Sequence, residues 1–217
     1  MRLDFRSFPY KSGDRVCYML MPQGLTADAE KWLETASERY RVTAVVVTGM
    51  DWNDDLTPWP ADGVFRKAKS FGGKAEEFLK ELTAEIERFE SDFGPVSERY
   101  LLGISLSGLF ALWAAFRSDF FAGIISISGS LWYDGFAEWA AGRLPVVKDL
   151  YISLGDREKN SKDRRMCTVQ DATESLVKAL QSSGVPVRYV VERDTTHFSP
   201  IVPRLQMAFE QVLQPIS

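Results

Sequence analysis

Short apolar runs alternate with longer amphipathic segments along most of the chain, and this alternation predicts β-strands separated by α-helices. The predicted strands lie at 15–21, 42–48, 100–104, 123–128, 150–154 and 187–191. The run VTAVVVT at 42–48 is rich in β-branched residues and shows no alternation of apolar and polar positions. A strand with that pattern is expected to be buried on both faces of a sheet.

The amphipathic segments predict helices at 29–40, 74–90, 107–116, 132–141, 168–181 and 203–213. In the clearest of them, Phe78, Leu82, Ile86 and Phe89 recur at helical spacing on one face. Each connection between parallel strands needs a crossover, so the alternation predicts an α/β fold with a mostly parallel, doubly wound sheet between two helical layers. An antiparallel strand or a hairpin is expected to lead it. No repeat or low-complexity linker interrupts the pattern, and one domain is expected over 1–217.

The composition excludes several classes of partner. The 217 residues are 45% hydrophobic and 26% charged, which is typical of a soluble globular protein. A net charge of −4 disfavours nucleic acid, and no run approaches the roughly 18 to 20 apolar residues of a membrane span. Cys17 and Cys167 fit no metal-ligand spacing, and the N-terminus does not resemble a signal peptide. We expect a cytoplasmic protein with no membrane partner and no metal or other cofactor.

Ser105 lies at the corner between a predicted strand and a predicted helix, in the segment GISLSG at 103–108. A nucleophilic serine at such a corner has a strained backbone, so bulky residues two positions before or after it would collide. The usual pattern is G-x-S-x-G, and here Gly103 precedes the serine while Ser107 replaces the second glycine. Ser107 itself has Leu109 two positions later. We interpret Ser105 as the nucleophile and Ser107 as a spacer; the alternative is a serine helix cap beside a glycine turn.

A serine hydroxyl attacks well only beside a base, and the base needs an acid to orient it. His197 is the only histidine, and it follows the last predicted strand, as the chain order serine, acid, histidine requires. The acid is expected after the strand at 150–154, where Asp156 and Glu158 compete. The common arrangement places the acid three residues after the glycine that ends the strand. Gly155 then favours Glu158, with Asp156 as the alternative.

Two backbone N–H groups are expected to hold the oxyanion of a tetrahedral intermediate. One is the amide of Leu106, at the start of the helix that follows the corner. The other is expected in the loop GMDWNDD at 49–55, from Met50 or Asp51.

Several segments also agree in order with a known family: DDLTPWP (54–60), FGGKAEEFLKELTAEIERF (71–89), GISLSG (103–108), SISGSLWY (126–133) and ISLGDREK (152–159). Over about residues 40–200 they resemble the esterase branch of the α/β-hydrolase superfamily, which contains siderophore esterases, esterase D-like carboxylesterases, and feruloyl or acetyl esterases. The resemblance implies an α/β-hydrolase fold and a serine carboxylesterase with nucleophile Ser105, acid Glu158 and base His197. It also implies that the DLTP loop and the SLW segment line the substrate cleft. The chain departs from the family at Ser107, where a glycine is usual, and at Trp52, where an arginine is usual.

Two groups of residues are candidates for substrate binding. Cations on a predicted rim loop would steer an anionic ester: Arg66, Lys67 and Lys69. Aromatic residues in loops after strand ends would form a pocket for an aromatic or apolar ester: Trp52, Trp59, Trp132 and Tyr133.

The leading hypothesis is hydrolysis of a small carboxylic ester through an acyl-enzyme, with aromatic, anionic and siderophore-like esters as the candidate substrates. The alternatives are a hydrolase-like binding protein whose site has decayed, and a thioesterase or acyltransferase that uses the same three residues.

Overall fold

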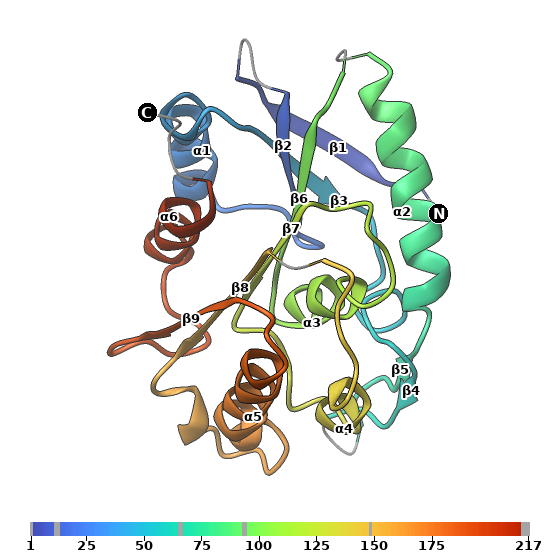
Figure 1. The fold of residues 1–217 in the computed structure, drawn as a ribbon, viewed down its shortest axis with the longest axis vertical. Coiled ribbons are helices and arrows are strands. Elements are labelled where there is room, and N and C mark those ends of the chain that lie inside the picture. Colours follow the sequence, from blue (N-terminus) through green and yellow to red (C-terminus); the bar gives the residue numbers. More distant parts are fainter. Residues whose placement is uncertain (1, 11–13, 65–66, 93–94, 148, 214–217) are drawn as a thin grey trace.

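A computed structural model describes residues 2–10, 14–64, 67–92, 95–147 and 149–213, and its main feature is one seven-stranded sheet (Figure 1). The strand order is β1–β3–β2–β6–β7–β8–β9. The strands are β1 (Asp4–Phe8), β2 (Arg15–Leu20), β3 (Thr43–Thr48), β6 (Glu98–Ile104), β7 (Gly123–Ile127), β8 (Asp149–Gly155) and β9 (Val187–Glu192). All neighbouring pairs are parallel except β1 and β3. The leading antiparallel strand therefore pairs with β3 and does not form a hairpin with β2.

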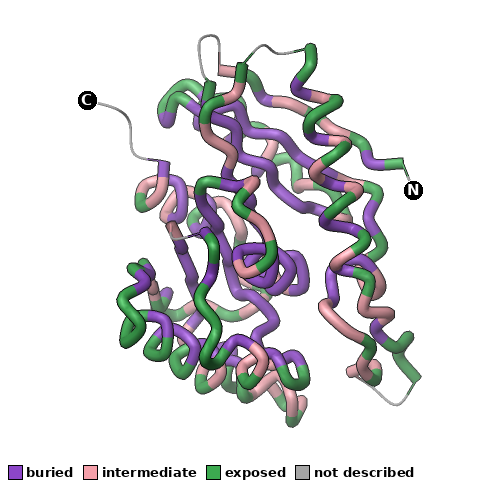
Figure 2. Tube along the Cα trace, turned by 45° about the vertical axis from the view of Figure 1, so that its right-hand side comes forward, coloured by how far each residue is buried: buried purple, intermediate pink, exposed green. Residues whose placement is uncertain are grey.

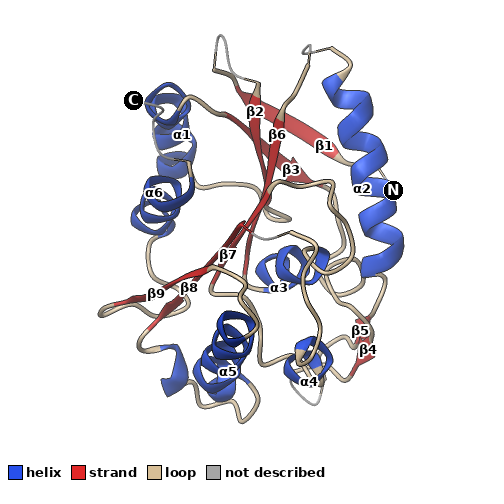
Figure 3. Ribbon diagram, in the orientation of Figure 1, coloured by secondary structure: helices blue, strands red, loops and turns tan. Residues whose placement is uncertain are grey.

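Helices cover both faces of this sheet (Figure 3). One face packs against α1 (Ala27–Tyr40) and α6 (Ile201–Val212). The other packs against α2 (Ala75–Glu90), α3 (Leu106–Ala114), α4 (Phe136–Ala140) and α5 (Val169–Ser182). The predicted three-layer α/β/α arrangement is confirmed.

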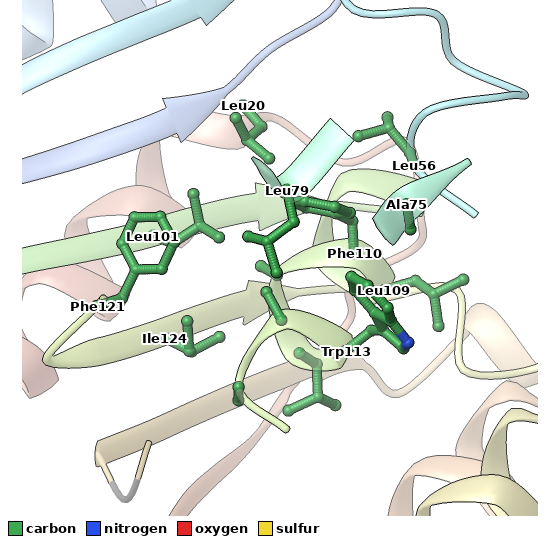
Figure 4. Close-up of a cluster of buried hydrophobic side chains, with 14 of the residues drawn as sticks. Leu20, Leu56, Ala75, Leu79, Leu101, Leu109, Phe110, Trp113, Phe121 and Ile124 are labelled. Atoms are coloured by element: carbon green, nitrogen blue, oxygen red, sulfur yellow. The ribbon is translucent and has the colours of Figure 1, made fainter. Parts of the chain in front are cut away.

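The core lies in two apolar clusters, one on each side of the sheet. Figure 4 shows part of the larger cluster, to which α2 contributes Leu79, α3 contributes Phe110 and β6 contributes Leu101. Every residue of α3 is buried, because this helix lies between the sheet and the other helices. The central strands are buried along nearly their whole length, whereas the outer helices alternate between buried and exposed residues (Figure 2). A rigid sheet of this kind holds the residues at its strand ends in fixed positions.

The segment after β7 differs from its prediction. The sequence predicts a helix over 132–141, but α4 has only five residues. Gly135 directly precedes it with φ of 77°, a left-handed conformation that does not extend a helix toward the N-terminus.

Some short elements were not predicted: the paired strands β4 (Pro60–Ala61) and β5 (Phe71–Gly72), and the 3-10 turns η1 (Glu158–Asn160) and η2 (Met166–Thr168). No helix within the described ranges has the length and apolar character needed to cross a membrane.

Candidate active site

Ser105 occupies the sharp turn between β6 and α3. Its φ of 61° and ψ of −123° lie in a region that non-glycine residues rarely adopt and that costs about 1–3 kcal/mol. Backbone hydrogen bonds on both sides hold this conformation. The Ser105 amide donates to the Ile127 carbonyl at 3.1 Å, and the Ser105 carbonyl accepts from the amides of Leu109 and Ser130, each at 3.0 Å. The hydroxyl is thereby presented at the carboxyl end of the sheet.

The residues two positions before and two positions after Ser105 fit the turn closely. A Cβ at Gly103 would lie 2.0 Å from the Ser107 carbonyl oxygen, so only glycine is compatible with this backbone. Ser107 is buried, and its hydroxyl donates to the Ile104 carbonyl at 2.8 Å and accepts from the Ile104 amide at 2.9 Å. Ile104 is the last residue of β6, so the Ser107 hydroxyl holds the backbone where the strand ends. The Ser107 hydroxyl is therefore used by the backbone of the turn, and Ser107 is not placed as a nucleophile.

His197 lies in the loop between β9 and α6, and its Nε2 is 3.0 Å from the Ser105 Oγ. Backbone hydrogen bonds join this loop to the end of β8. The Asp156 amide donates to the Glu192 carbonyl at 3.0 Å, and the Arg157 amide donates to the Thr195 carbonyl at 3.0 Å. The loop carrying the imidazole and the segment carrying the acid therefore have fixed relative positions.

Of the two competing carboxylates, Glu158 is the one that contacts the imidazole. Its Oε2 lies 2.9 Å from His197 Nδ1, and its Oε1 accepts the Gly155 amide at 2.9 Å and the Ser128 hydroxyl. Asp156 instead accepts a hydrogen bond from the Thr195 amide at 3.2 Å, so its carboxylate binds the backbone of the loop that carries His197.

Burial raises the pKa of Glu158, but hydrogen bonds from His197, Ser128 and the Gly155 amide outweigh it, and the pKa is lowered below its ordinary value. The carboxylate is thus ionised at neutral pH, although the residue is only 6% exposed. An anion at this place favours a proton on the Nδ1 of the imidazole and leaves Nε2 as the acceptor facing Ser105.

The predicted oxyanion donors come from two segments, the start of α3 and the loop after β3. Leu106 is the first residue of α3, and amides in the first turn of a helix have no carbonyl partner within the helix. The Asp51 amide donates to the Asp55 carboxylate at 2.6 Å and is therefore occupied. Of the two alternatives on that loop, Met50 stays as the proposed second donor.

A cavity of about 530 Å³ opens beside the Ser105 hydroxyl. Trp52 and Trp132 line it, as predicted for substrate-binding residues, together with Met166 and Val169 from η2 and α5. Phe198, next to the histidine, lies at the same cavity and is 93% exposed. A larger and more open hollow of about 650 Å³, at the other end of β8 and β9, contains none of the predicted site residues.

Two of the predicted aromatic residues do not line this cavity. The Trp59 indole donates to the Asp134 carbonyl at 2.8 Å and packs against Trp139, with ring centroids 5.9 Å apart. The Tyr133 hydroxyl donates to the Trp59 carbonyl at 2.6 Å, and its side chain is buried. These rings brace the loops behind the cavity, because each uses its polar group on backbone carbonyls.

Of the predicted basic rim, Lys69 is the residue that the structure shows in ion pairs. Lys69 lies 3.1 Å from an Asp51 oxygen and 3.3 Å from an Asp54 oxygen, so its charge is offset locally. Lys67 is exposed and does not line the cavity, and Arg66 lies outside the described residues.

Sequence reasoning missed three buried residues around the site. Ser130 lines the cavity with its hydroxyl 3.4 Å from that of Ser105. Ser128 and Arg204 lie behind Glu158, on the side away from the histidine. The spacing S-x-S after a buried strand was visible in the sequence, but no pattern indicated that an arginine of the last helix reaches the acid. Among the described residues, no group of three or more His, Cys, Asp or Glu side chains is arranged to hold a metal ion.

Comparison with known proteins identifies relatives at two levels. Residues 25–190 match the model of the Esterase family, described as "Putative esterase". The protein YbbA of Bacillus subtilis (strain 168), whose own description is "uncharacterized", is 28% identical over 162 residues, which cover 70% of this chain. The chain spans 65% of the length of that relative.

Solved structures share the fold. The siderophore hydrolase EstA from Aspergillus nidulans superposes with a TM-score of 0.67 at 21% identity, covering 97% of this chain and 89% of EstA. An IroE-like serine hydrolase from Shewanella oneidensis gives a TM-score of 0.74 at 16% identity, covering 93% of this chain and 69% of that protein. The predicted α/β-hydrolase fold is confirmed.

Proposed function

Since the chain belongs to the Esterase family of α/β-hydrolases, we propose that it is a serine carboxylesterase that hydrolyses small esters through an acyl-enzyme. The observation that carries this proposal is the pair of contacts at His197, whose Nε2 lies 3.0 Å from the Ser105 hydroxyl and whose Nδ1 lies 2.9 Å from Glu158. Both distances are within hydrogen-bond reach, which is the first requirement for a nucleophile, base and acid to act together.

In the proposed reaction the Ser105 Oγ attacks the ester carbonyl carbon while its proton passes to His197 Nε2. The negative charge moves to the carbonyl oxygen, where the amides of Leu106 and Met50 would hold it. The intermediate collapses, the C–O bond to the alcohol breaks, and His197 returns the proton to the leaving alkoxide. Water then repeats the sequence on the acyl-enzyme, and the carboxylic acid and free serine are released.

The proposed substrates carry an aromatic or apolar group. Trp52, Trp132 and Val169 supply apolar wall to the cavity, and its volume of about 530 Å³ suits one small-molecule group. The name of the similar Aspergillus protein, a siderophore hydrolase, makes siderophore-like and other anionic esters a second class to test. Because Lys69 is balanced by two aspartates, neutral aryl esters are expected to be the better substrates.

Two other functions would use the same site differently. A binding protein with a decayed site is disfavoured by the strained Ser105 backbone, since such strain persists in proteins mainly where function needs it. Thioester hydrolysis and acyl transfer use the same three side chains, and a panel of acceptors distinguishes them.

The test is turnover of p-nitrophenyl and aryl esters by purified wild type, Ser105→Ala and Ser183→Ala. Ser183 is an exposed serine at the end of α5 and serves as the matched control. Loss of turnover in the Ser105 variant alone, with an unchanged melting temperature, is the expected result. Equal rates in wild type and Ser105→Ala would rule the proposal out.

A further inference from the structure

Behind the proposed acid lies a buried polar network that the esterase mechanism itself does not use. Arg204, in the first turns of α6, is only 2% exposed, and Glu192, the last residue of β9, is 5% exposed. The Arg204 Nε lies 2.7 Å from one Glu192 oxygen, and its Nη2 lies 3.2 Å from the other. This two-pronged contact fixes the plane of the guanidinium group.

The same guanidinium group reaches the acid. Arg204 Nη2 lies 3.5 Å from Glu158 Oε1 and also donates to the Ser128 hydroxyl. Ser128 in turn donates to Glu158 Oε1. A hydroxyl has a single proton, and because Arg204 occupies an acceptor lone pair of Ser128, that proton is directed to Glu158.

We propose that Arg204, held by Glu192, is a positioning residue that acts through Ser128 to keep Glu158 turned toward His197. Oε1 of Glu158 is saturated by donors on the side away from the imidazole, so only Oε2 is left for Nδ1. The guanidinium charge also offsets the cost of burying the two carboxylates that it contacts, Glu158 and Glu192. This inference rests on the proposed esterase function.

The network predicts how the pH dependence of the reaction responds to its removal. The groups that face Glu158 come from every neighbouring element: His197 from the loop after β9, Ser128 after β7, the Gly155 amide of β8, Arg204 of α6, and Tyr189 and Glu192 of β9. Of these, Arg204 supplies the permanent positive charge. Without it the Glu158–His197 pair binds protons more tightly, and activity, which requires the ionised carboxylate together with the unprotonated imidazole Nε2, is lost at a higher pH than in wild type.

The experiment compares kcat/KM against pH for wild type, Arg204→Met, Arg204→Lys and Ser128→Ala with a neutral p-nitrophenyl ester, whose charge does not change. We expect Arg204→Met to lower kcat about 10- to 100-fold with little change in KM. We also expect it to move the acid limb upward by about one pH unit, and Arg204→Lys to restore part of that shift. Ser128→Ala removes only a hydroxyl and is expected to lower kcat and move the acid limb upward, as Arg204→Met does. It therefore tests the inference even if Arg204→Met does not fold.

Arg99→Met is the matched control, because it removes a similar ion pair at the opposite end of β6. Arg99 Nη2 lies 2.6 Å from the buried Glu90 carboxylate. This variant is expected to lose stability but to keep the wild-type pH profile. An active wild type whose profile is matched by folded Arg204→Met, or by Ser128→Ala, overturns this inference alone. An inactive wild type overturns the esterase proposal, and this inference with it.

Discussion

Replacing Glu158 by glutamine tests the proposed acid without changing the shape of the side chain. Glu158 Oε1 accepts hydrogen bonds from the Gly155 amide and the Ser128 hydroxyl. In the variant, the amide oxygen of glutamine must therefore take the place of Oε1. Its NH₂ group then replaces Oε2 and points at Nδ1 of His197, at a site where the wild-type distance is 2.9 Å. A donor there requires an unprotonated Nδ1, which puts the imidazole proton on Nε2, facing Ser105. The imidazole can then no longer accept the serine proton.

The expected cost follows from that tautomer. Replacing the acid of a serine–histidine–carboxylate arrangement by its amide lowers kcat by about 10⁴-fold, or about 5 kcal/mol of transition-state stabilisation. The assay is kcat/KM for a p-nitrophenyl ester at pH 8, with the melting temperature measured in parallel. Asp156→Asn is the control, because an amide oxygen can still accept the Thr195 amide, and its kcat/KM is expected to stay within about twofold of wild type. A folded Glu158→Gln variant that keeps more than a tenth of wild-type kcat/KM would refute this reasoning.

Three further predictions concern the corner, the cavity and the acid. Ser107→Ala removes the hydroxyl that contacts both the amide and the carbonyl of Ile104 and is expected to cost about 1–3 kcal/mol, measured by urea denaturation; an unchanged midpoint would contradict it. Trp132→Ala is expected to raise KM for aryl esters about tenfold because it removes cavity wall, whereas Trp59→Phe leaves KM unchanged; equal effects would show that the cavity is wrongly assigned. The pKa of Glu158 is lower in the folded protein than the ordinary glutamate value of about 4.3. The ionised carboxylate therefore stabilises the fold fully above that pH, and this contribution is lost as the pH falls through the lowered pKa. The difference in unfolding free energy between wild type and Glu158→Gln is therefore expected to shrink between about pH 5 and pH 3, and a difference that is constant with pH would contradict the lowered pKa.

The fold was largely predictable because burial on both faces of a parallel sheet leaves a strong apolar signal. The runs at 42–48 and 123–128 coincide closely with β3 and β7, and the positions of Ser105 and His197 follow from where strands end. The short α4 was overestimated, since the apolar residues at 131–133 belong to a turn that ends at Gly135. Apolar periodicity does not register such a turn.

Contacts that depend on side-chain direction were less predictable. Trp52 and Trp59 both follow strand ends in aromatic loops, yet only Trp52 lines the cavity, because the indole N–H of Trp59 is used by a backbone carbonyl. Lys69 was a plausible anion contact in sequence, but the loop folds it onto two aspartates. Arg204 is 46 residues from Glu158 along the chain, and only the packing of α6 against β7 and β8 brings it there.

The central claim is that the Ser105 hydroxyl is activated by His197. A fluorophosphonate probe reacts quickly only with an activated serine, so intact-mass and peptide analysis of the labelled wild-type chain tests the claim directly. We predict one adduct per chain, on the peptide that contains Ser105, and loss of labelling in His197→Gln. Labelling of a different serine, or equal labelling of wild type and His197→Gln, would contradict it.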